Sequence, residues 1–486
     1  MSGYVSNPAS RRRFLALLGG GLGAVLAACA PAAPPTGTPA PSKPAEKPAA
    51  APAATKPAEK SAAAPPTAAK PAEPAKASAG GATKLRATVW VGQQELDALG
   101  KMTNAHKEKN PNVDVEWINI SGGGPYGRDK LQAMIAGGDA PDMMMLNTGQ
   151  FEGLAGRSAL AVLDDYVKGD NFDLGIYWPQ AVDGSKFQGK LYALPRDMSN
   201  VILYYNKELF DKAGVAYPNN DWTWNNFLEA AKKLTLDKDK SGKVNQWGFG
   251  VLNIVWNWAG FVWGNGGEVL SPDRKKSQFQ DPKTIEALKF YYGLHTDQKV
   301  SPLPGALPEQ ANSLDWFRTQ SVAMGLFGPW WRPTLVGLPD DKRFKWDVAY
   351  PPKAPGTGKR GSVVYTDQWG VGSGSKVGKE AWSFMKFLTG KDGQVMWTEL
   401  IGARSISPVK EVAQSEKWLH YGGSTGEIIL DSLSFSQAPP VNFANANEAE
   451  TIWNDELGLV IAGQEKVEQA VQNIDAKLAP VLAANK

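Results

Sequence analysis

The strongest constraint on the fold is an alternation of strand-like and helix-like segments. Leu85 to Val91, Val113 to Ile118 and Asp142 to Leu146 are rich in branched and apolar residues, as strands are. Helices are predicted between them, over Gln93 to Lys109 and Tyr126 to Ala136. Strands that alternate with helices pair in parallel, and the helices cover both faces of the sheet. The sequence therefore predicts an α/β fold with a mostly parallel sheet.

Residues that directly follow these strands are candidates for ligand contact, because ligands of such sheets bind at the carboxyl ends of the strands. Trp90 and Gln93 stand at the end of the first strand. Asn147, Thr148 and Gln150 follow the third. For each of them, a place in a solvated loop or at a helix cap is the alternative.

A proline suggests where the chain leaves this first sheet. At 486 residues the chain is too long for a single core, and two or three domains are expected. Two β-prone runs, Leu191 to Leu194 and Val201 to Tyr205, flank Pro195, which has no backbone N–H to donate to a sheet. We expect the sheet to be interrupted over Arg196 to Asn200, and the chain to cross there to a second lobe. An ordinary loop in one large sheet is the alternative.

The rest of the chain continues the mixture of strands and helices. Pro351 to Gly361 is rich in proline and glycine and is the predicted second crossing. The apolar patterns predict helices over 222–236, 282–296, 379–389 and 466–478, and strands over 247–251, 321–327, 346–350 and 363–369.

Charge and composition narrow the function. The chain has 52 Lys and Arg against 49 Asp and Glu, a formal net charge of +3, which gives no support to a nucleic-acid partner. Its three histidines are far apart and Cys29 is its single cysteine. Neither an intramolecular disulfide nor a Cys/His metal cluster is therefore expected, and we predict no metal and no cofactor. The 18 tryptophans must fill cores, but they also suit a site that stacks flat ligands.

Residues 1–29 are typical of an export signal. Arg11 to Arg13 precede the apolar stretch Phe14 to Ala28, which is shorter than the roughly 20 residues of a membrane-spanning helix and resembles a signal-peptide core. Consecutive arginines followed by Phe-Leu resemble a twin-arginine signal, and Leu26 to Cys29 resembles a bacterial lipobox. Cleavage would leave Cys29 lipidated and anchor the exported protein at the outer face of the cytoplasmic membrane, at the cell surface or in the periplasm. A chance cysteine in an ordinary secretion signal is the alternative.

Residues 30–83 predict a disordered tether. The segment consists of Pro, Ala, Lys, Glu, Thr, Ser and Gly, without an aromatic, Leu, Ile or Val residue. It cannot bury enough apolar surface to offset the entropy lost on ordering. We expect a semi-extended spacer between the membrane and the folded body.

A carbohydrate-active enzyme is the alternative from another class of function. A glycoside hydrolase needs two carboxyl groups about 5–10 Å apart across a cleft. Asp164 and Asp165 are the obvious pair, but adjacent residues point apart, and this pair resembles the start of a helix. The G-x-S-x-G and H-E-x-x-H motifs and the Walker loop are absent from the sequence. Their absence favours a binding protein over an enzyme.

Four segments, taken in order, resemble family 1 of the extracellular solute-binding proteins. They are Pro141 to Phe151, Gly189 to Asp197, Tyr204 to Gly214 and Asp221 to Asn225. The members are sugar-binding lipoproteins of ABC importers, similar in fold to maltose-binding protein. The resemblance covers residues 84–486, and the succession of the segments is more specific than any one of them.

The resemblance implies a periplasmic-binding-protein type II fold, with two lobes that are each a mostly parallel sheet flanked by helices, joined by hinge crossings. It implies a monomer that captures a carbohydrate between the lobes and delivers it to the permease of an ABC importer, without catalysis. A receptor for another small polar solute, such as a polyol or a peptide, is the alternative. Residues 84–198 with 362–415 would form the first lobe, and 199–361 with 416–486 the second.

Tryptophans are the first candidates for sugar contact. A neutral sugar needs flat apolar faces against its C–H groups and planar polar groups for its hydroxyls. By resemblance, Trp256 stands where maltose-binding protein has a stacking tyrosine, and Trp330 matches a stacking tryptophan. Trp258 and Trp331 are further candidates, and a place in the core is the alternative for Trp258.

Polar candidates lie near the crossings. Relatives often carry an acidic residue two positions after Arg-Asp, where this chain has Ser199 and so lacks a carboxylate that the family uses. The candidates are Arg196 and Asp197 at the first crossing, Asp367 and Trp369 near the second, and Arg404 in a loop where relatives reach the cleft.

Overall fold

A computed structural model describes residues 82–122, 124–237, 240–302, 313–441, 443 and 445–484. These residues all lie in one of the two units into which the chain divides. The predicted signal peptide of residues 1–29, with the lipidation site Cys29, lies outside the described residues. So does the predicted tether of residues 30–83, except for its last two residues.

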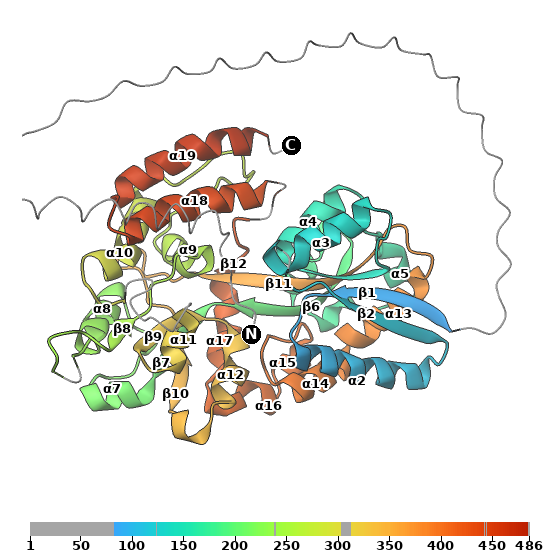
Figure 1. Cartoon of the computed structure of the whole chain (residues 1–486), viewed down its shortest axis with the longest axis horizontal. Helices are drawn as coiled ribbons and strands as arrows, with labels where there is room; N and C mark the ends of the chain where they lie inside the picture. The colour runs from blue at the N-terminus through green and yellow to red at the C-terminus, as the bar shows by residue number, and fades with distance from the viewer. Residues whose placement is uncertain are drawn as a thin grey trace, which may run out of the picture. The chain divides into compact units, whose positions relative to one another are not determined.

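The first sheet contains the predicted strand–helix alternation. Its strand order is β12-β11-β3-β1-β2, and β6 also pairs with β11 (Figure 1). β1 is parallel to both β2 and β3, which confirms the parallel pairing expected from the sequence. β11 runs antiparallel to β3 and to β6. The strands are β1 (Thr83–Val89), β2 (Val113–Asn119), β3 (Met143–Leu146), β6 (Ala193–Asn200), β11 (Ser362–Val371) and β12 (Ser436–Gln437).

The second sheet has the order β10-β7-β9-β8. β7 lies antiparallel between β10 and β9, and β8 is parallel to β9. We call each sheet with the helices that pack on it a lobe. The strands are β7 (Ile202–Asn206), β8 (Trp247–Phe249), β9 (Val322–Phe327) and β10 (Trp346–Ala349); β4 (Lys186–Phe187) and β5 (Lys190–Leu191) form a separate ribbon.

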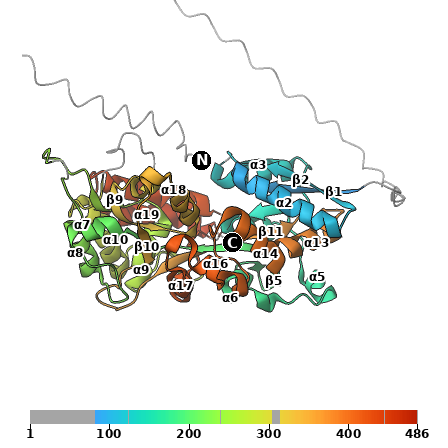
Figure 2. The same cartoon turned by 90° about the horizontal axis from the view of Figure 1, so that it is seen from below.

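The helices build the faces of both lobes. Figure 2 shows α2, α13 and α14 beside the first sheet, and α7, α8 and α10 in the other lobe. The helices predicted over Gln93 to Lys109 and Pro282 to Thr296 are present with those bounds, as α2 and α10. The main helices are α2 (Gln93–Lys109), α3 (Gly124–Ala136), α4 (Thr148–Gly156), α5 (Asp164–Gly169), α6 (Pro179–Asp183), α7 (Lys207–Ala213), α8 (Trp224–Lys233), α9 (Val255–Gly264), α10 (Pro282–Thr296), α11 (Ser313–Arg318), α12 (Arg332–Val336), α13 (Gly378–Thr389), α14 (Lys391–Ile401), α15 (Lys410–Ala413), α16 (Glu416–Leu419), α17 (Gly426–Asp431), α18 (Ala446–Ile461) and α19 (Val467–Ala483), and a 3-10 turn, η2, covers Pro329–Trp331.

The predicted interruption of the sheet over Arg196 to Asn200 is wrong. β6 runs through Pro195 to Asn200 and stays paired with β11. Asp367 pairs with Asp197 but Gln368 pairs with Pro195, so one extra residue of β6 bulges out of the ladder. A bulge disrupts the ladder locally, and a proline without an N–H is tolerated at such a place. The chain changes sheets one step later, at Val201.

The second crossing lies where it was predicted, between the end of β10 and the start of β11. The two crossings are hydrogen-bonded to each other, because the amide of Val201 donates to the Val363 carbonyl (3.3 Å) and to the Ser362 hydroxyl (3.2 Å). α9 packs directly on the second crossing. A Cβ atom on Gly260 would lie 2.7 Å from the Gly361 carbonyl oxygen, so the two backbones touch.

Each lobe has its own core. Leu85, Met143 and Trp369 are in the core on one face of the first sheet, and α18 and α19 close the core of the second lobe over α10, as the predicted terminal helix should. The α/β prediction is confirmed. The residue boundaries of the lobes remain a prediction.

Candidate ligand-binding site

The site is built on the β6–β11 pair, where the chain passes between the lobes. Tyr365 is the partner of Ser199, and Asp367 is the partner of Asp197. Alternate residues of a strand point to the same face of the sheet, so these side chains share one face. Tyr365, Asp367 and Ser199 are half-buried, whereas their neighbour Thr366 is buried. This face of the pair forms the floor of the candidate site.

The bulge in β6 brings two successive side chains together on the floor. Adjacent strand residues ordinarily point to opposite faces. Arg196 is the extra residue, and the bulge re-aims its side chain so that its Nη1 atom lies 2.6 Å from Oδ2 of Asp197 and 3.7 Å from Oδ2 of Asp367. The same feature that accommodates Pro195 therefore creates the polar end of the site.

Two further charged residues complete what we call the acid–arginine cluster: Glu95, Arg196, Asp197, Asp367 and Arg404. Glu95, in the first turn of α2, accepts from Arg196 at 3.3 Å through Oε1 and from Arg404 at 2.7 Å through Oε2. The Arg196 guanidinium lies 5.0 Å from the ring centroid of Trp397. Charge pairing and the aromatic contact fix this guanidinium in place.

The cluster holds three carboxyl groups against two guanidinium groups. The pKa of Asp197 is raised, because the effect of burial exceeds the opposite effect of the Arg196 charge. Burial and the neighbouring charge of Asp197 raise the pKa of Asp367 to about 8. Near neutral pH the cluster therefore retains a proton and presents both donors and acceptors. That combination is what a ligand rich in hydroxyl groups requires.

Aromatic rings lie beside this cluster. Trp256, in the first turn of α9, and Trp330, in η2, have ring centroids 5.1 Å apart at an interplanar angle of 40°. Trp256 also meets Tyr365 edge-on at 6.3 Å. We call these three residues the aromatic cluster. Since Tyr365 is two residues from Asp367 on β11, the aromatic and acid–arginine clusters are adjacent on the same floor.

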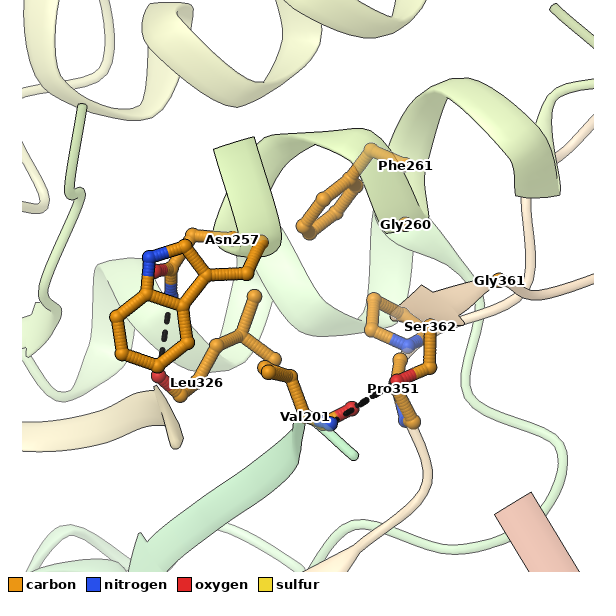
Figure 3. Close-up of a pocket in the computed structure, with 10 residues that line it drawn as sticks. Val201, Asn257, Gly260, Phe261, Leu326, Pro351, Gly361 and Ser362 are labelled. Carbon is orange, nitrogen blue, oxygen red and sulfur yellow. Dashed lines mark hydrogen bonds between the residues drawn. The ribbon is translucent and has the colours of Figure 1, made fainter. Parts of the chain in front are cut away.

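A small pocket lies where α9 meets the two crossings (Figure 3). Val201 and Ser362 face each other in it, and the buried Asn257 donates to the Leu326 carbonyl at 3.0 Å. The pocket has room for about one water molecule. It is too small for a sugar ring. Its lining residues are Val201, Trp256, Asn257, Gly260, Phe261, Leu326, Pro351, Pro352, Gly361 and Ser362.

The candidates around α4 and α2 make contacts within the chain. Asn147 caps α4 and accepts from the Gln150 amide at 3.0 Å, while the Gln150 side chain accepts from the Asn147 amide at 3.1 Å. Thr148 donates to the Thr366 carbonyl at 3.1 Å. Gln93 is exposed and donates to Asp97 at 2.7 Å. Trp90 is half-buried between two apolar clusters of the first lobe.

Three predicted tryptophans lie in cores. Trp258 has no exposed surface and packs against Phe279 (5.8 Å) and Trp453 (6.4 Å), so the core alternative holds for it. Trp331 is 6% exposed and Trp369 is 2% exposed. Indole rings buried in this way pack against the chain itself, and the structure does not bring these three into the aromatic cluster.

Sequence reasoning missed Glu95 and Tyr365. Glu95 lies two residues after the candidate Gln93. It falls within the predicted helix, and nothing in the local sequence distinguishes it as a ligand-binding residue. Tyr365 lies in a predicted strand, and only the pairing with β6 shows which way it faces. Asp164 begins α5, as expected, and accepts from the Leu191 amide at 3.1 Å.

The two α/β lobes, the paired crossings and a floor on the first lobe that meets aromatic side chains of the second define a two-lobed binding protein. The chain matches the family model of the bacterial extracellular solute-binding proteins over residues 92–395. It belongs to this family.

Relatives of known sequence agree with that assignment. A putative binding protein of Brucella abortus is 27% identical over 298 residues, which are 60% of this chain and 68% of that protein. The arabinooligosaccharide-binding protein of Halalkalibacterium halodurans is 24% identical over 383 residues, 72% of this chain and 79% of that protein.

Solved structures show the same fold. An ABC substrate-binding protein of Listeria monocytogenes in complex with cycloalternan has a TM-score of 0.73 at 29% identity, covering 82% of this chain and 99% of that chain. A maltose-bound protein of T. maritima has a TM-score of 0.69 at 22% identity, with 82% and 99% covered. The predicted type II periplasmic-binding-protein fold is thereby confirmed.

Two further findings concern the described residues alone. None of their helices is long and apolar enough to cross a membrane. Within the same part of the chain, no group of three or more His, Cys, Asp or Glu side chains is placed to hold a metal ion.

Proposed function

We propose that this chain is the substrate-binding component of an ABC importer, that it captures a carbohydrate between its lobes and that it delivers the sugar to a membrane permease. The observation that carries the proposal is the floor on β11. Tyr365 joins the aromatic cluster, and two residues away Asp367 joins the acid–arginine cluster. Flat apolar faces next to convergent donors and acceptors are what a sugar ring needs on its two kinds of surface.

Family membership and the ligands named for its relatives support a carbohydrate as the ligand. Arabinooligosaccharide is named for one relative, and cycloalternan is bound in one structure of similar fold. The ligand of this chain would stack on Trp256 and Trp330 and donate hydroxyl protons to carboxylates of the acid–arginine cluster. Its contact set includes Arg196, Asp197, Asp367 and Arg404, with Glu95 behind them.

Capture works by a shift between open and closed arrangements of the lobes. The two crossings are the connections that must bend, and a ligand that contacts both lobes favours the closed arrangement by its differential affinity. The protein binds and releases its ligand without chemical change and acts as a monomer. The lipid on Cys29 and the tether of residues 30–83 keep it at the outer face of the membrane, near its permease.

A thermal-shift screen of the full chain tests this function. Mono- and oligosaccharides, polyols and short peptides are added in turn, and each ligand that raises the melting temperature is recovered and analysed. We expect a carbohydrate to stabilise the protein and to be recovered unchanged. A carbohydrate recovered in shortened form would contradict a purely binding role, and stabilisation by peptides or polyols alone would replace the carbohydrate as the ligand class.

A further inference from the structure

One ion pair joins the two lobes away from the floor of the site. Glu152 lies on α4 of the first lobe, and Arg274 lies at the tip of the hairpin turn between α9 and α10 in the second. Nη1 of Arg274 is 3.3 Å from Oε2 of Glu152. The Glu152 side chain is 25% exposed and the Arg274 side chain 33%, so the pair is partly shielded from water. Burial raises the pKa of Glu152 to about 7, although Arg274 lowers it, so the pair is fully charged above that pH.

The turn that carries Arg274 is held rigidly. Ser271 accepts from the Arg274 amide at 2.7 Å and donates its own amide to the Lys276 carbonyl at 2.8 Å. Below the tip, Ser277 and Gln280 both donate to Asp475 of α19, the latter at 2.6 Å. The position of the Arg274 backbone is therefore fixed to the body of the second lobe.

The Arg274 backbone is itself strained. Its φ angle is 56°, in the left-handed region that a side chain other than glycine seldom occupies. Such strain persists where the surrounding structure enforces it, and it is often associated with a functional position. Here it leaves the guanidinium directed at the other lobe.

Glu152 is equally well anchored. It lies one turn into α4, whose N-terminus is capped by Asn147 and whose first residue, Thr148, is hydrogen-bonded to β11. Approach of the lobes therefore brings the Glu152 carboxylate and the Arg274 guanidinium together.

We propose that Glu152 and Arg274 form an ion-pair latch between the lobes, which favours the closed arrangement without touching the ligand. The two are positioning residues. Because each side chain is anchored in a different lobe, opening of the cleft separates the charges and loses their attraction. The part of this inference that concerns ligand capture rests on the proposed function, whereas the latch itself is a property of the ligand-free protein.

Distance measurements between spin labels test the latch in the full chain. Cys29→Ser removes the native cysteine, and Lys101→Cys on α2 and Lys233→Cys on α8 place one exposed label on each lobe. At low ionic strength, Glu152→Arg should lengthen the distance between the labels, because it sets two like charges against each other. Combining Glu152→Arg with Arg274→Glu should restore the original distance. High salt should lengthen the distance in the chain with the native pair, because it screens the attraction.

Glu468→Arg is the matched control. It reverses the same kind of charge in a 2.7 Å pair with Lys289, but both partners lie in the second lobe, on α19 and α10. It should leave the distance unchanged. An unaltered distance in Glu152→Arg, or a failure of the double exchange to restore it, would overturn the latch.

Ligand affinity provides a separate result. For a carbohydrate that raises the melting temperature, Glu152→Arg should weaken binding about two- to fivefold, as expected for a partly exposed pair, and the double exchange should recover the loss. Weakening that the double exchange does not recover would contradict the coupling of the latch to capture. If no carbohydrate binds, the proposed function fails, but the distances in the ligand-free protein still decide the latch.

Discussion

At the scale of single residues, the position of the Trp330 side chain depends on its neighbours. Its ring lies over Gly328, where a Cβ atom would come within 1.8 Å of the indole, so only glycine leaves the ring in place. The ring also meets Trp256, with the ring centroids 5.1 Å apart. Trp330 is half-buried, whereas the next residue, Trp331, is 6% exposed and packs against Phe327 at 5.4 Å.

Trp330→Ala should weaken carbohydrate binding about 10- to 100-fold, which corresponds to about 1.4–2.8 kcal/mol, because a stacking surface is lost. Titration calorimetry with a carbohydrate found in the thermal-shift screen measures the change. Trp331→Phe is the control, and it should lower the melting temperature while leaving the affinity nearly unchanged. Equal effects of the two substitutions on affinity would remove Trp330 from the contact set.

The pKa of Asp367 gives a prediction about stability and pH. In the folded protein it is raised from its usual value to about 8. Between about pH 4 and pH 8 the folded state therefore keeps a proton that the unfolded state releases, so the free energy of unfolding falls as the pH rises through this window. Asp367→Asn has no such proton. In this variant the free energy of unfolding should therefore decrease with pH by at least about 1 kcal/mol less than in the wild type.

Urea unfolding at pH 5 and pH 8 measures the difference. Some pH dependence should remain in Asp367→Asn, because the pKa of Asp197 is raised as well. Glu108→Gln changes an exposed carboxylate at the far end of α2. In this control the free energy of unfolding should decrease between pH 5 and pH 8 by the same amount as in the wild type. A fall of equal size in Asp367→Asn and wild type would show that Asp367 does not hold the proton.

At the scale of elements, α9 links the ligand site to the second crossing. Its first turn carries Trp256, and its last turns lie against Arg360 and Gly361 through Gly260 and Gly264. The glycines are one helical turn apart, so they form one face on which the crossing rests. A side chain on this face would push the helix away from the crossing and would shift Trp256 with it.

Gly260→Ala should therefore destabilise the protein by about 1–3 kcal/mol, because the new Cβ would lie 2.7 Å from the Gly361 oxygen. The helix propensity of alanine acts in the opposite direction. Gly100→Ala on α2 isolates that propensity, since nothing lies within 4 Å of its added Cβ, and it should stabilise the protein by about 0.5–1 kcal/mol. Chemical unfolding of both variants gives the comparison, and stabilisation in both would contradict the close contact.

Local sequence patterns predict much of the order of helices and strands. The assembly of the site depends instead on the pairing of distant strands. The end of the first helix at Asn110-Pro111 and the apolar pattern over Pro282 to Thr296 are local signals, and the helices Gln93 to Lys109 and Pro282 to Thr296 both have the expected bounds. The bulge at Arg196 depends on β11, more than 160 residues later, so the proline alone led to the wrong interruption. For the same reason the sequence indicated Arg196, Asp197, Asp367 and Arg404 as separate candidates but not as one cluster with Glu95.

At the scale of the whole molecule, the structure has two lobes, each with its own sheet, and a floor on β6 and β11 of the first sheet that Trp256 of the second lobe meets through Tyr365. The crossings are tied together by the hydrogen bonds between Val201 and Ser362, so they should bend as one hinge. The aromatic cluster is formed by residues of α9, η2 and β11, and the acid–arginine cluster by residues of α2, β6, β11 and the loop after α14. A ligand held between the two clusters would therefore contact elements of both lobes and favour their closure.

The most direct test of this account is the distance between labels at Lys101→Cys and Lys233→Cys, in the Cys29→Ser background, with and without a carbohydrate from the screen. Binding should shorten the distance, and Trp330→Ala should require more ligand to reach the same shortening. A carbohydrate that binds at the stoichiometry of one site and leaves the distance unchanged would contradict capture between the lobes.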